Sequence, residues 1–227
     1  MKTLVIDIGG TNIKMLATGQ DTERKFPSGP RMTALQMVEN VQRATVDWEY
    51  DGVSIGYPGP VIHDKLALEP RNLAPGWVDF DFAAAFGKPV KLINDAAMQA
   101  LGSYEGGRML FLGLGTGLGS ALIIDGVIAP LELAHLPYRK CRTFEDYVGL
   151  RGLVRLGKKK WTKAVADVTA RLQAAMVADS VVLGGGNAKK LKRLPTGARL
   201  GLNTNAFLGG FRLWDPQARH QMEATVR

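Results

Sequence analysis

Two glycine-rich turns, each between two short apolar segments, constrain the fold of this chain more than any other feature. The first turn, Gly9-Gly10-Thr11, separates residues 3–8 from residues 12–18. The second lies in GLGTGLGS, residues 113–120, between apolar runs at 109–114 and 121–124. Apolar runs of this length that break at glycine are typical of strands joined by tight turns. The sequence therefore predicts a duplicated strand–turn–strand unit.

The remaining segments alternate between helical and extended patterns. Apolar residues three or four apart predict a helix over 32–48, with Leu35 in its buried stripe, and another over 161–176. Further strands are expected at 52–56, 88–93 and 180–183, and a last helix at 206–213. LEPRNLAPGW, residues 68–77, holds too much Pro and Gly for a regular element. Strands alternating with helices indicate an α/β protein with a largely parallel sheet.

Composition limits the class of protein. A chain of 227 residues, 46% hydrophobic and 22% charged, can form one large domain or two small lobes. No apolar run approaches the roughly 18 residues that span a membrane. We interpret MKTLVIDIGG as a first strand rather than a signal peptide. Cys141 is the single cysteine, which excludes an internal disulfide and is consistent with a reducing cytoplasm.

The formal net charge of +8 favours polyanionic partners. The chain has no zinc-finger spacing, basic heptad arm or aromatic–basic RNA motif, so we expect no nucleic-acid partner. For each basic cluster the simpler interpretation is a solvated surface. The clusters are Arg139-Lys140-Arg142, Lys158 to Lys160 with Lys163, and Lys189-Lys190-Lys192-Arg193.

Asn94-Asp95 lies at a predicted strand-to-helix junction, the edge at which α/β proteins usually bind ligands. A lone Asp at such a place usually caps its helix. Here a glycine turn lies on either side in the sequence. Two turns able to hold phosphates, with a potential base between them, suggest phosphoryl transfer to a small hydroxylated substrate.

The first turn is a candidate phosphate site. Gly9 and Gly10 lack a Cβ and tolerate positive φ, so backbone N–H groups can approach phosphate oxygens, and Thr11 adds a hydroxyl. Asp7 would orient a magnesium-bound water, since Mg²⁺ favours one or two carboxylates plus phosphate oxygens. Neither turn matches the P-loop or the dinucleotide fingerprint.

The ordered set DIGGTNIK, SIGYPGPV, LINDAAMQ, GLGTGLGSALI, ELAH and VVLGGGNAK resembles the ROK family of bacterial sugar kinases, in the hexokinase/actin superfamily. The resemblance covers residues 2–213. The chain is most similar to the polyphosphate glucokinases, which are similarly short and share the NxxxxW stretch from Asn72 to Trp77. The resemblance to the ROK family implies an α/β, two-lobed actin-like ATPase (ribonuclease H-like) fold with the active site in the interlobe cleft. The N-terminal lobe would span 1–93, rejoined by a C-terminal helix at 204–227, and the second lobe 94–203.

The resemblance also implies roles for individual residues. Asp95 would be the base that accepts the proton of the sugar 6-hydroxyl. The substrate-binding set would be Gly59, Asn72, Asn94, Asp95, Glu132, His135 and Glu145. The phosphate- or nucleotide-binding set would be Asp7, Gly9, Gly10, Thr11, Asn12, Lys14, Gly115, Thr116, Gly117, Gly184, Gly185 and Gly186. Asp7 would hold Mg²⁺ through water, and the last three glycines would face an adenosine if the donor is a nucleotide.

The chain departs from the family pattern near Cys141. Many ROK proteins bind a structural zinc through three cysteines after a Gly-His pair, whereas ELAH has Ala134 in place of that glycine. One thiol and one imidazole cannot form a four-coordinate zinc site, so we expect no structural zinc. The polyphosphate glucokinases lack this zinc too. His135 as a hydrogen-bonded core histidine is the alternative to a sugar ligand, and without the cysteines the register of Glu145 is open.

The expected activity is a glucokinase that transfers a phosphoryl group from polyphosphate, ATP or both to the glucose 6-hydroxyl. One alternative is an ATP-dependent ROK kinase for mannose, fructose or an N-acetylhexosamine. Another is a non-catalytic ROK sugar-sensing regulator, which is disfavoured because Met1 leads directly into the first strand without a helix-turn-helix. We expect a cytoplasmic homodimer that requires Mg²⁺ and has no membrane partner.

Overall fold

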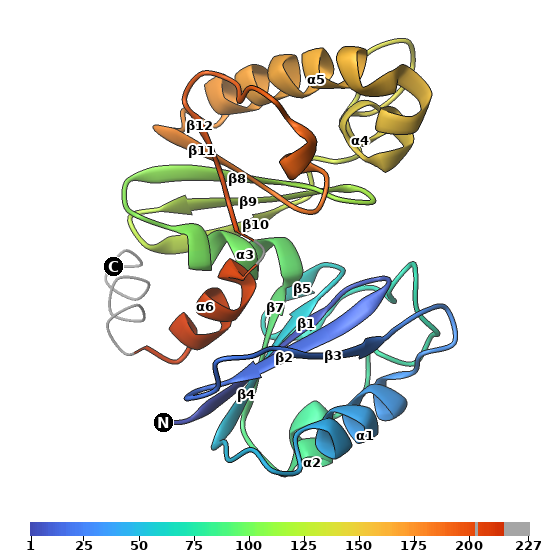
Figure 1. Ribbon diagram of the computed structural model, residues 1–227, viewed down its shortest axis with the longest axis vertical. Coiled ribbons are helices and arrows are strands. Elements are labelled where there is room, and N and C mark those ends of the chain that lie inside the picture. The colour runs from blue at the N-terminus through green and yellow to red at the C-terminus, as the bar shows by residue number, and fades with distance from the viewer. Residues whose placement is uncertain (203, 216–227) are drawn as a thin grey trace.

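The computed structural model describes residues 1–202 and 204–215. It contains two five-stranded sheets, with helices α3 and α6 lying between them (Figure 1). Each sheet is built from its own continuous stretch of chain, the first from residues 3–94 and the second from 108–200.

The first sheet has the order β3-β2-β1-β4-β7. Its strands are β1 (Thr3–Ile8), β2 (Asn12–Ala17), β3 (Arg24–Pro27), β4 (Gly52–Tyr57) and β7 (Val90–Asn94). Helices α1 (Ala34–Ala44) and α2 (Phe82–Phe86) belong to this half, as does the small hairpin β5 (Val61–Ile62) and β6 (Lys65–Leu66).

The second sheet has the order β10-β9-β8-β11-β12. Its strands are β8 (Arg108–Leu114), β9 (Leu118–Ile124), β10 (Val127–Leu131), β11 (Ser180–Gly184) and β12 (Ala198–Leu200). The other elements are α3 (Asp95–Ser103), α4 (Phe144–Val148), α5 (Leu150–Ala175), the 3₁₀ helix η1 (Ala188–Lys190) and α6 (Asn205–Arg212).

The two sheets share one connectivity, which confirms the predicted duplication. In each, the first strand forms an antiparallel hairpin with the second across a glycine turn and pairs in parallel with the fourth. The expectation of a largely parallel sheet was wrong. Each sheet combines two antiparallel and two parallel pairings, because the tight glycine turns reverse the chain.

The predicted helices are present with different ends. Helix α1 begins at a capping box formed by Thr33 and Gln36, and it ends before Thr45 and Trp48. Leu35, predicted to be buried, is 54% exposed. The first half of α5 was missed because Gly157 interrupts it with a φ of 71°.

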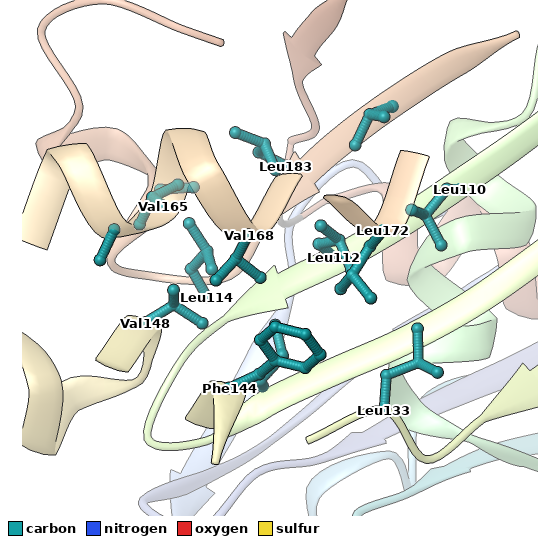
Figure 2. Packing of buried hydrophobic residues seen from close by; sticks show 14 of the residues in the cluster. Leu110, Leu112, Leu114, Leu133, Phe144, Val148, Val165, Val168, Leu172 and Leu183 are labelled. Carbon is teal, nitrogen blue, oxygen red and sulfur yellow. The ribbon is translucent and has the colours of Figure 1, made fainter. Parts of the chain in front are cut away.

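A hydrophobic cluster beneath α5 supports the second sheet (Figure 2). Val165, Val168 and Leu172 of α5 pack over Leu112 and Leu183 of the sheet, as their helical spacing predicted. A second cluster lies around α1 in the first half. A third surrounds α3 and joins the two halves, since it includes strand residues from both sheets.

Helices α3 and α6 pack at backbone contact. A Cβ added at Gly102 would collide with the carbonyl oxygen of Asn205, and one added at Gly209 would collide with that of Met98. The two helices can therefore approach this closely only because both positions are glycine.

The predicted boundary at residues 93 and 94 falls at the junction of β7 and α3. The division into lobes of 1–93 and 94–203 stays a prediction, and residues 203 and 216–227 lie outside the described part. Within that part, no helix has the length and apolar character that crossing a membrane requires.

Candidate active site

A cavity of about 440 Å³ is lined by residues from both halves of the molecule. Every residue predicted to bind a sugar lines it. A larger and more open depression of about 770 Å³, around Trp48 and Lys88, is lined by no residue with a predicted role. The cavity lining includes Gly59, Asn72, Asn94, Asp95, Glu132, His135 and Glu145, with Gly10, Gly115, Thr116 and Gly117 of the two glycine turns and Gly185 of the glycine run at 184–186.

The junction of β7 and α3 holds Asp95 in place. Asn94 is the N-cap of α3: its Oδ1 accepts a hydrogen bond from the Ala97 N–H at 3.0 Å. Its Nδ2 donates to the Gly59 carbonyl at 3.1 Å. Asp95 is thus not the capping residue of its helix. Its Oδ1 accepts from the Ala96 N–H at 2.7 Å, which orients the carboxylate at the cavity wall.

Two carboxyl groups at this edge have raised pKa values. Burial, together with the charges of Asp7 and Glu132, raises the pKa of Asp95 to about 7 against the opposing hydrogen bond from Ala96. Burial likewise raises the pKa of Asp7 to about 6, while the Lys14 ammonium opposes that change. A carboxylate whose pKa lies near neutrality suits a general base.

His135 and Glu145 also line the cavity. His135 is exposed, which contradicts the alternative of a core histidine. Its Nε2 lies 3.3 Å from Nη2 of Arg71. A guanidinium can only donate, so a hydrogen bond between the two side chains requires Nε2 to be the acceptor. Glu145, in the first turn of α4, accepts from the Leu118 N–H at 3.2 Å through Oε2.

The first glycine turn is held closed by hydrogen bonds. The Gly9 N–H donates to the Asn12 carbonyl at 3.0 Å, and Ser28 Oγ donates to the Gly9 carbonyl at 2.6 Å. Neither Gly9 nor Gly10 has a positive φ, so the expectation that glycine is needed here for a positive φ was wrong. Gly9 is required by close approach instead, since an added Cβ would lie 2.8 Å from the Asn12 oxygen.

The second glycine turn joins β8 and β9 and packs against the start of α3. A Cβ added at Gly119 would lie 2.7 Å from the Cβ of Ala96, next to Asp95. Gly115 accepts hydrogen bonds from the Leu150 N–H at 3.1 Å and from Asn187 Nδ2 at 2.8 Å. The hairpin is therefore held from α5 and from the segment after β11.

Several predicted phosphate-site residues do not line the cavity. Lys14 lies opposite Asp7 in the β1–β2 register, with its Nζ 3.7 Å from Glu23. In the third glycine run only Gly185 reaches the cavity, and Gly184 packs against Phe111. The residues outside the lining are Asp7, Gly9, Thr11, Asn12, Lys14, Gly184 and Gly186.

The cavity also contains residues that the sequence analysis missed. Gln99 follows Asp95 by four residues, a spacing that places both on one helix face. Glu69 and Arg71 lie beside Asn72 in the irregular stretch. That helical spacing could have identified Gln99, whereas no pattern could place the irregular stretch over the cavity.

Among residues 1–202 and 204–215, no group of three or more His, Cys, Asp or Glu side chains could hold a metal by itself. Mg²⁺ does not need such a group, because this ion takes one or two protein carboxylates and completes its coordination shell with phosphate oxygens and water. The partly buried Asp7 carboxyl, whose charge acts on Asp95, fits that requirement.

The ROK family model matches residues 3–130, more than half of the chain. This chain belongs to the ROK family. The match includes the first glycine turn, Asp95 and the hairpin at 113–120.

Individual relatives of this ROK protein extend the likeness over most of its length. A polyphosphate glucokinase from Mycobacterium tuberculosis is 26% identical over 211 residues, covering 82% of this chain and 77% of the relative. An N-acetylmannosamine kinase from Vibrio vulnificus is 30% identical over 143 residues, covering 55% and 48%.

A solved structure shows the same fold. The inorganic polyphosphate/ATP-glucomannokinase from Arthrobacter sp. strain KM aligns with a TM-score of 0.79 and 23% identity, covering 98% of this chain and 99% of that one. This likeness confirms the two-lobed, actin-like ATPase fold that the sequence predicted.

Proposed function

We propose that this ROK-family protein is a glucokinase, a sugar kinase that transfers a phosphoryl group from polyphosphate or ATP to the 6-hydroxyl of glucose. The observation that carries the proposal is the position of Asp95. Its carboxylate, with a pKa near neutrality, lines a cavity between two glycine turns and among amide, imidazole and carboxylate side chains.

The cavity suits a hexose because a sugar is recognised through several hydroxyl groups. Asn72 and Asn94 offer both donors and acceptors, and Glu132 and Glu145 offer acceptors. His135 adds ring nitrogens that can donate or accept a hydrogen bond. The set can hold a hexose in one orientation, with its 6-hydroxyl at Asp95.

The reaction then needs little covalent chemistry from the protein. Asp95 accepts the proton of the attacking hydroxyl, a role typically worth about 10² to 10⁴ in rate. The backbone amides of the hairpin at 113–119 hold the donor phosphates in line with the acceptor. Gly119 allows the hairpin to lie directly against the start of α3, so donor and base are close.

Asp7 would hold Mg²⁺ through water at the end of β1. When bound, Mg²⁺ neutralises negative charge on the donor phosphates. Burial raises the pKa of Asp7 to about 6, and a cation bound beside this carboxyl would favour its ionised form.

The sugar and the donor are the finer part of the proposal. Glucose and polyphosphate are supported by the mycobacterial relative, a polyphosphate glucokinase, and dual use of polyphosphate and ATP is supported by the Arthrobacter polyphosphate/ATP-glucomannokinase. Mannose is the second candidate sugar because of the glucomannokinase, and an N-acetylhexosamine the third because of the Vibrio kinase. A homodimer remains a prediction.

A matrix of acceptors and donors tests the proposal. Glucose, mannose, fructose, N-acetylglucosamine and N-acetylmannosamine are each incubated with ATP or polyphosphate in the presence of Mg²⁺, and products are assigned by NMR. We expect glucose 6-phosphate with at least one donor, and no product from 6-deoxyglucose. Sugar binding without turnover in every combination would instead indicate a sensor.

A further inference from the structure

The segment between His135 and Glu145 is a closed loop with its own support. Two backbone hydrogen bonds join its ends: Glu145 N–H to the Ala134 carbonyl at 3.0 Å, and Phe144 N–H to the Leu136 carbonyl at 3.2 Å. The substrate-site residues His135 and Glu145 flank it on either side. The conformation of this loop therefore affects where the backbone of both residues lies at the cavity.

The loop has features that make it costly to order. Lys140 and Cys141 both have positive φ values, 51° and 55°, which non-glycine residues seldom adopt. Its interior is closed by hydrogen bonds of the Tyr138 N–H to the Arg142 carbonyl and of the Arg142 N–H to the Arg139 carbonyl. A strained surface loop persists only where its surroundings hold it.

A single carboxylate on α5, that of Asp167, contacts the loop and stabilises its conformation. Asp167 Oδ2 accepts from the Tyr138 hydroxyl at 2.5 Å and from Arg171 Nε at 2.8 Å, and it lies 3.1 Å from Arg139 Nη2. Two of these three partners belong to the loop. Isolated surface ion pairs contribute little, but several charges on one acceptor form a network that can contribute more.

The aromatic ring of Tyr138 extends the same support into the core. It packs edge-on against Tyr147 of α4, with ring centroids 4.8 Å apart, and against Phe144 at 5.1 Å. Arg139 and Arg171 lie near its face at 4.8 and 5.8 Å. Phe144 belongs to the cluster beneath α5 that Figure 2 shows. The Tyr138 hydroxyl thus contacts α5, and the Tyr138 ring packs against α4.

From this geometry we infer that Asp167 is a positioning residue for sugar binding, acting through Tyr138 and Arg139 on the loop between His135 and Glu145. The inference rests on the proposed function, because it treats those two residues as sugar ligands. The hydrogen bond from Tyr138, followed by the two arginines, also lowers the pKa of Asp167, so the carboxylate stays ionised at neutral pH.

Loss of this support should affect sugar binding and leave the chemical step intact. Asp95 lies on α3, and its contacts do not involve the loop. In Asp167→Asn the sugar must order the loop when it binds. We expect the KM for glucose to rise about tenfold, the order of one hydrogen bond to a charged group, with kcat and the donor KM nearly unchanged.

The matched control is Asp47→Asn, which breaks the exposed pair of Asp47 with Arg24 in the first half. It makes the same chemical change away from the loop and should leave the sugar KM unaltered. Tyr138→Phe is the second variant, because it removes one hydrogen bond and keeps the ring packing. It should shift the sugar KM in the same direction by a smaller factor.

Hydrogen–deuterium exchange supplies a readout that needs no turnover. Amides of 138–145 should exchange faster in Asp167→Asn than in wild type or Asp47→Asn. Unchanged exchange there, or an unchanged sugar KM alongside lower stability, would overturn the inference. A wild-type protein inert toward every sugar and donor would refute the proposed function and the sugar-binding role together. Exchange would then decide separately whether Asp167 orders the loop.

Discussion

At the scale of single residues, Asn94 and Asp95 have different roles, and this difference determines the chemistry available at the site. Asn94 satisfies the helix N-terminus and ties it to Gly59, so Asp95 is not needed as a cap. A partly buried carboxyl whose pKa lies near neutrality is then left at the cavity wall. Two neighbouring polar residues at one junction thus have different tasks.

Replacing Asp95 with Asn tests the base directly. Asn keeps the size and can still accept the Ala96 N–H bond, but it cannot take a proton. We expect kcat to fall by about 10² or more, with sugar affinity by calorimetry changed only modestly. Asp81→Asn, at the N-cap of α2, is the control for an Asp at a helix start and should remain active. Near-normal turnover in Asp95→Asn would eliminate the base role.

The raised pKa of Asp95 predicts two pH effects of opposite direction. The base must be ionised, so kcat/KM for the sugar should rise as pH increases through about 7. The folded pKa lies above the unfolded one, so the native state binds more protons between about pH 4 and 7 and loses stability as pH rises through that range.

Thermal unfolding of Asp95→Asn measures the second effect. The variant should melt several degrees above wild type at pH 8, where the wild-type carboxyl is ionised and buried, and the difference should vanish near pH 4. Equal melting temperatures of the two proteins at pH 8 would contradict the burial of charge.

At the scale of elements, the second glycine hairpin is the part whose packing most directly concerns catalysis. Gly119 faces Ala96 at the start of α3, whereas Gly115 has no atom within 4 Å of its added Cβ. The same substitution at these two positions therefore has different physical consequences.

Gly119→Ala should displace the hairpin from α3 and lower both melting temperature and kcat, because the new methyl overlaps Ala96 and moves the donor site away from Asp95. Gly115→Ala should fold with near wild-type stability. Melting curves and donor kinetics of the pair decide the point: equal stability of the two variants would show that the close approach of hairpin and helix does not matter.

The loop around Cys141 gives a prediction about metal. Cys141 is exposed, and the loop is closed by the Asp167 network and by backbone hydrogen bonds. We expect Cys141→Ser to keep full activity, and metal analysis of the purified protein to find no stoichiometric zinc. Tightly bound zinc whose removal unfolds the protein would refute this.

How far the sequence predicted these elements depends on how local each signal is. The strands at 3–8 and 109–114, the Asn94-Asp95 junction and the buried face of α5 all follow from periodicity and glycine position, which are local properties. The cavity wall formed by Glu69 and Arg71 depends on where an irregular loop crosses the sheet, and the Asp167 network joins residues 29 positions apart. Long-range contacts of this kind leave no periodic trace.

At the scale of the whole molecule, the net charge of +8 bears on the donor. A long polyphosphate needs basic residues beyond the catalytic turns, whereas ATP does not. Helix η1 carries Lys189 and Lys190 directly after the glycine run that includes Gly185, and Gly185 lines the cavity. Lys190 has a local partner, since its Nζ donates to Asn187 Oδ1 at 2.8 Å, and Asn187 holds the hairpin through Gly115.

The donor prediction is therefore tested with Lys190 left in place. Clustered Lys and Arg release counterions when a polyanion binds, so by analogy with nucleic acids the polyphosphate KM should rise more steeply with salt than the ATP KM. Changing Lys189, Lys192 and Arg193 together to Gln should flatten that salt dependence and raise the polyphosphate KM, with ATP use nearly unaltered. The control changes Lys158, Lys159 and Lys160 of α5 to Gln, which removes the same charge elsewhere.

Equal effects of the two triple variants would mean that only net charge matters. Turnover with ATP but none with polyphosphate at low salt would leave the basic cluster as a solvated surface and make ATP the donor.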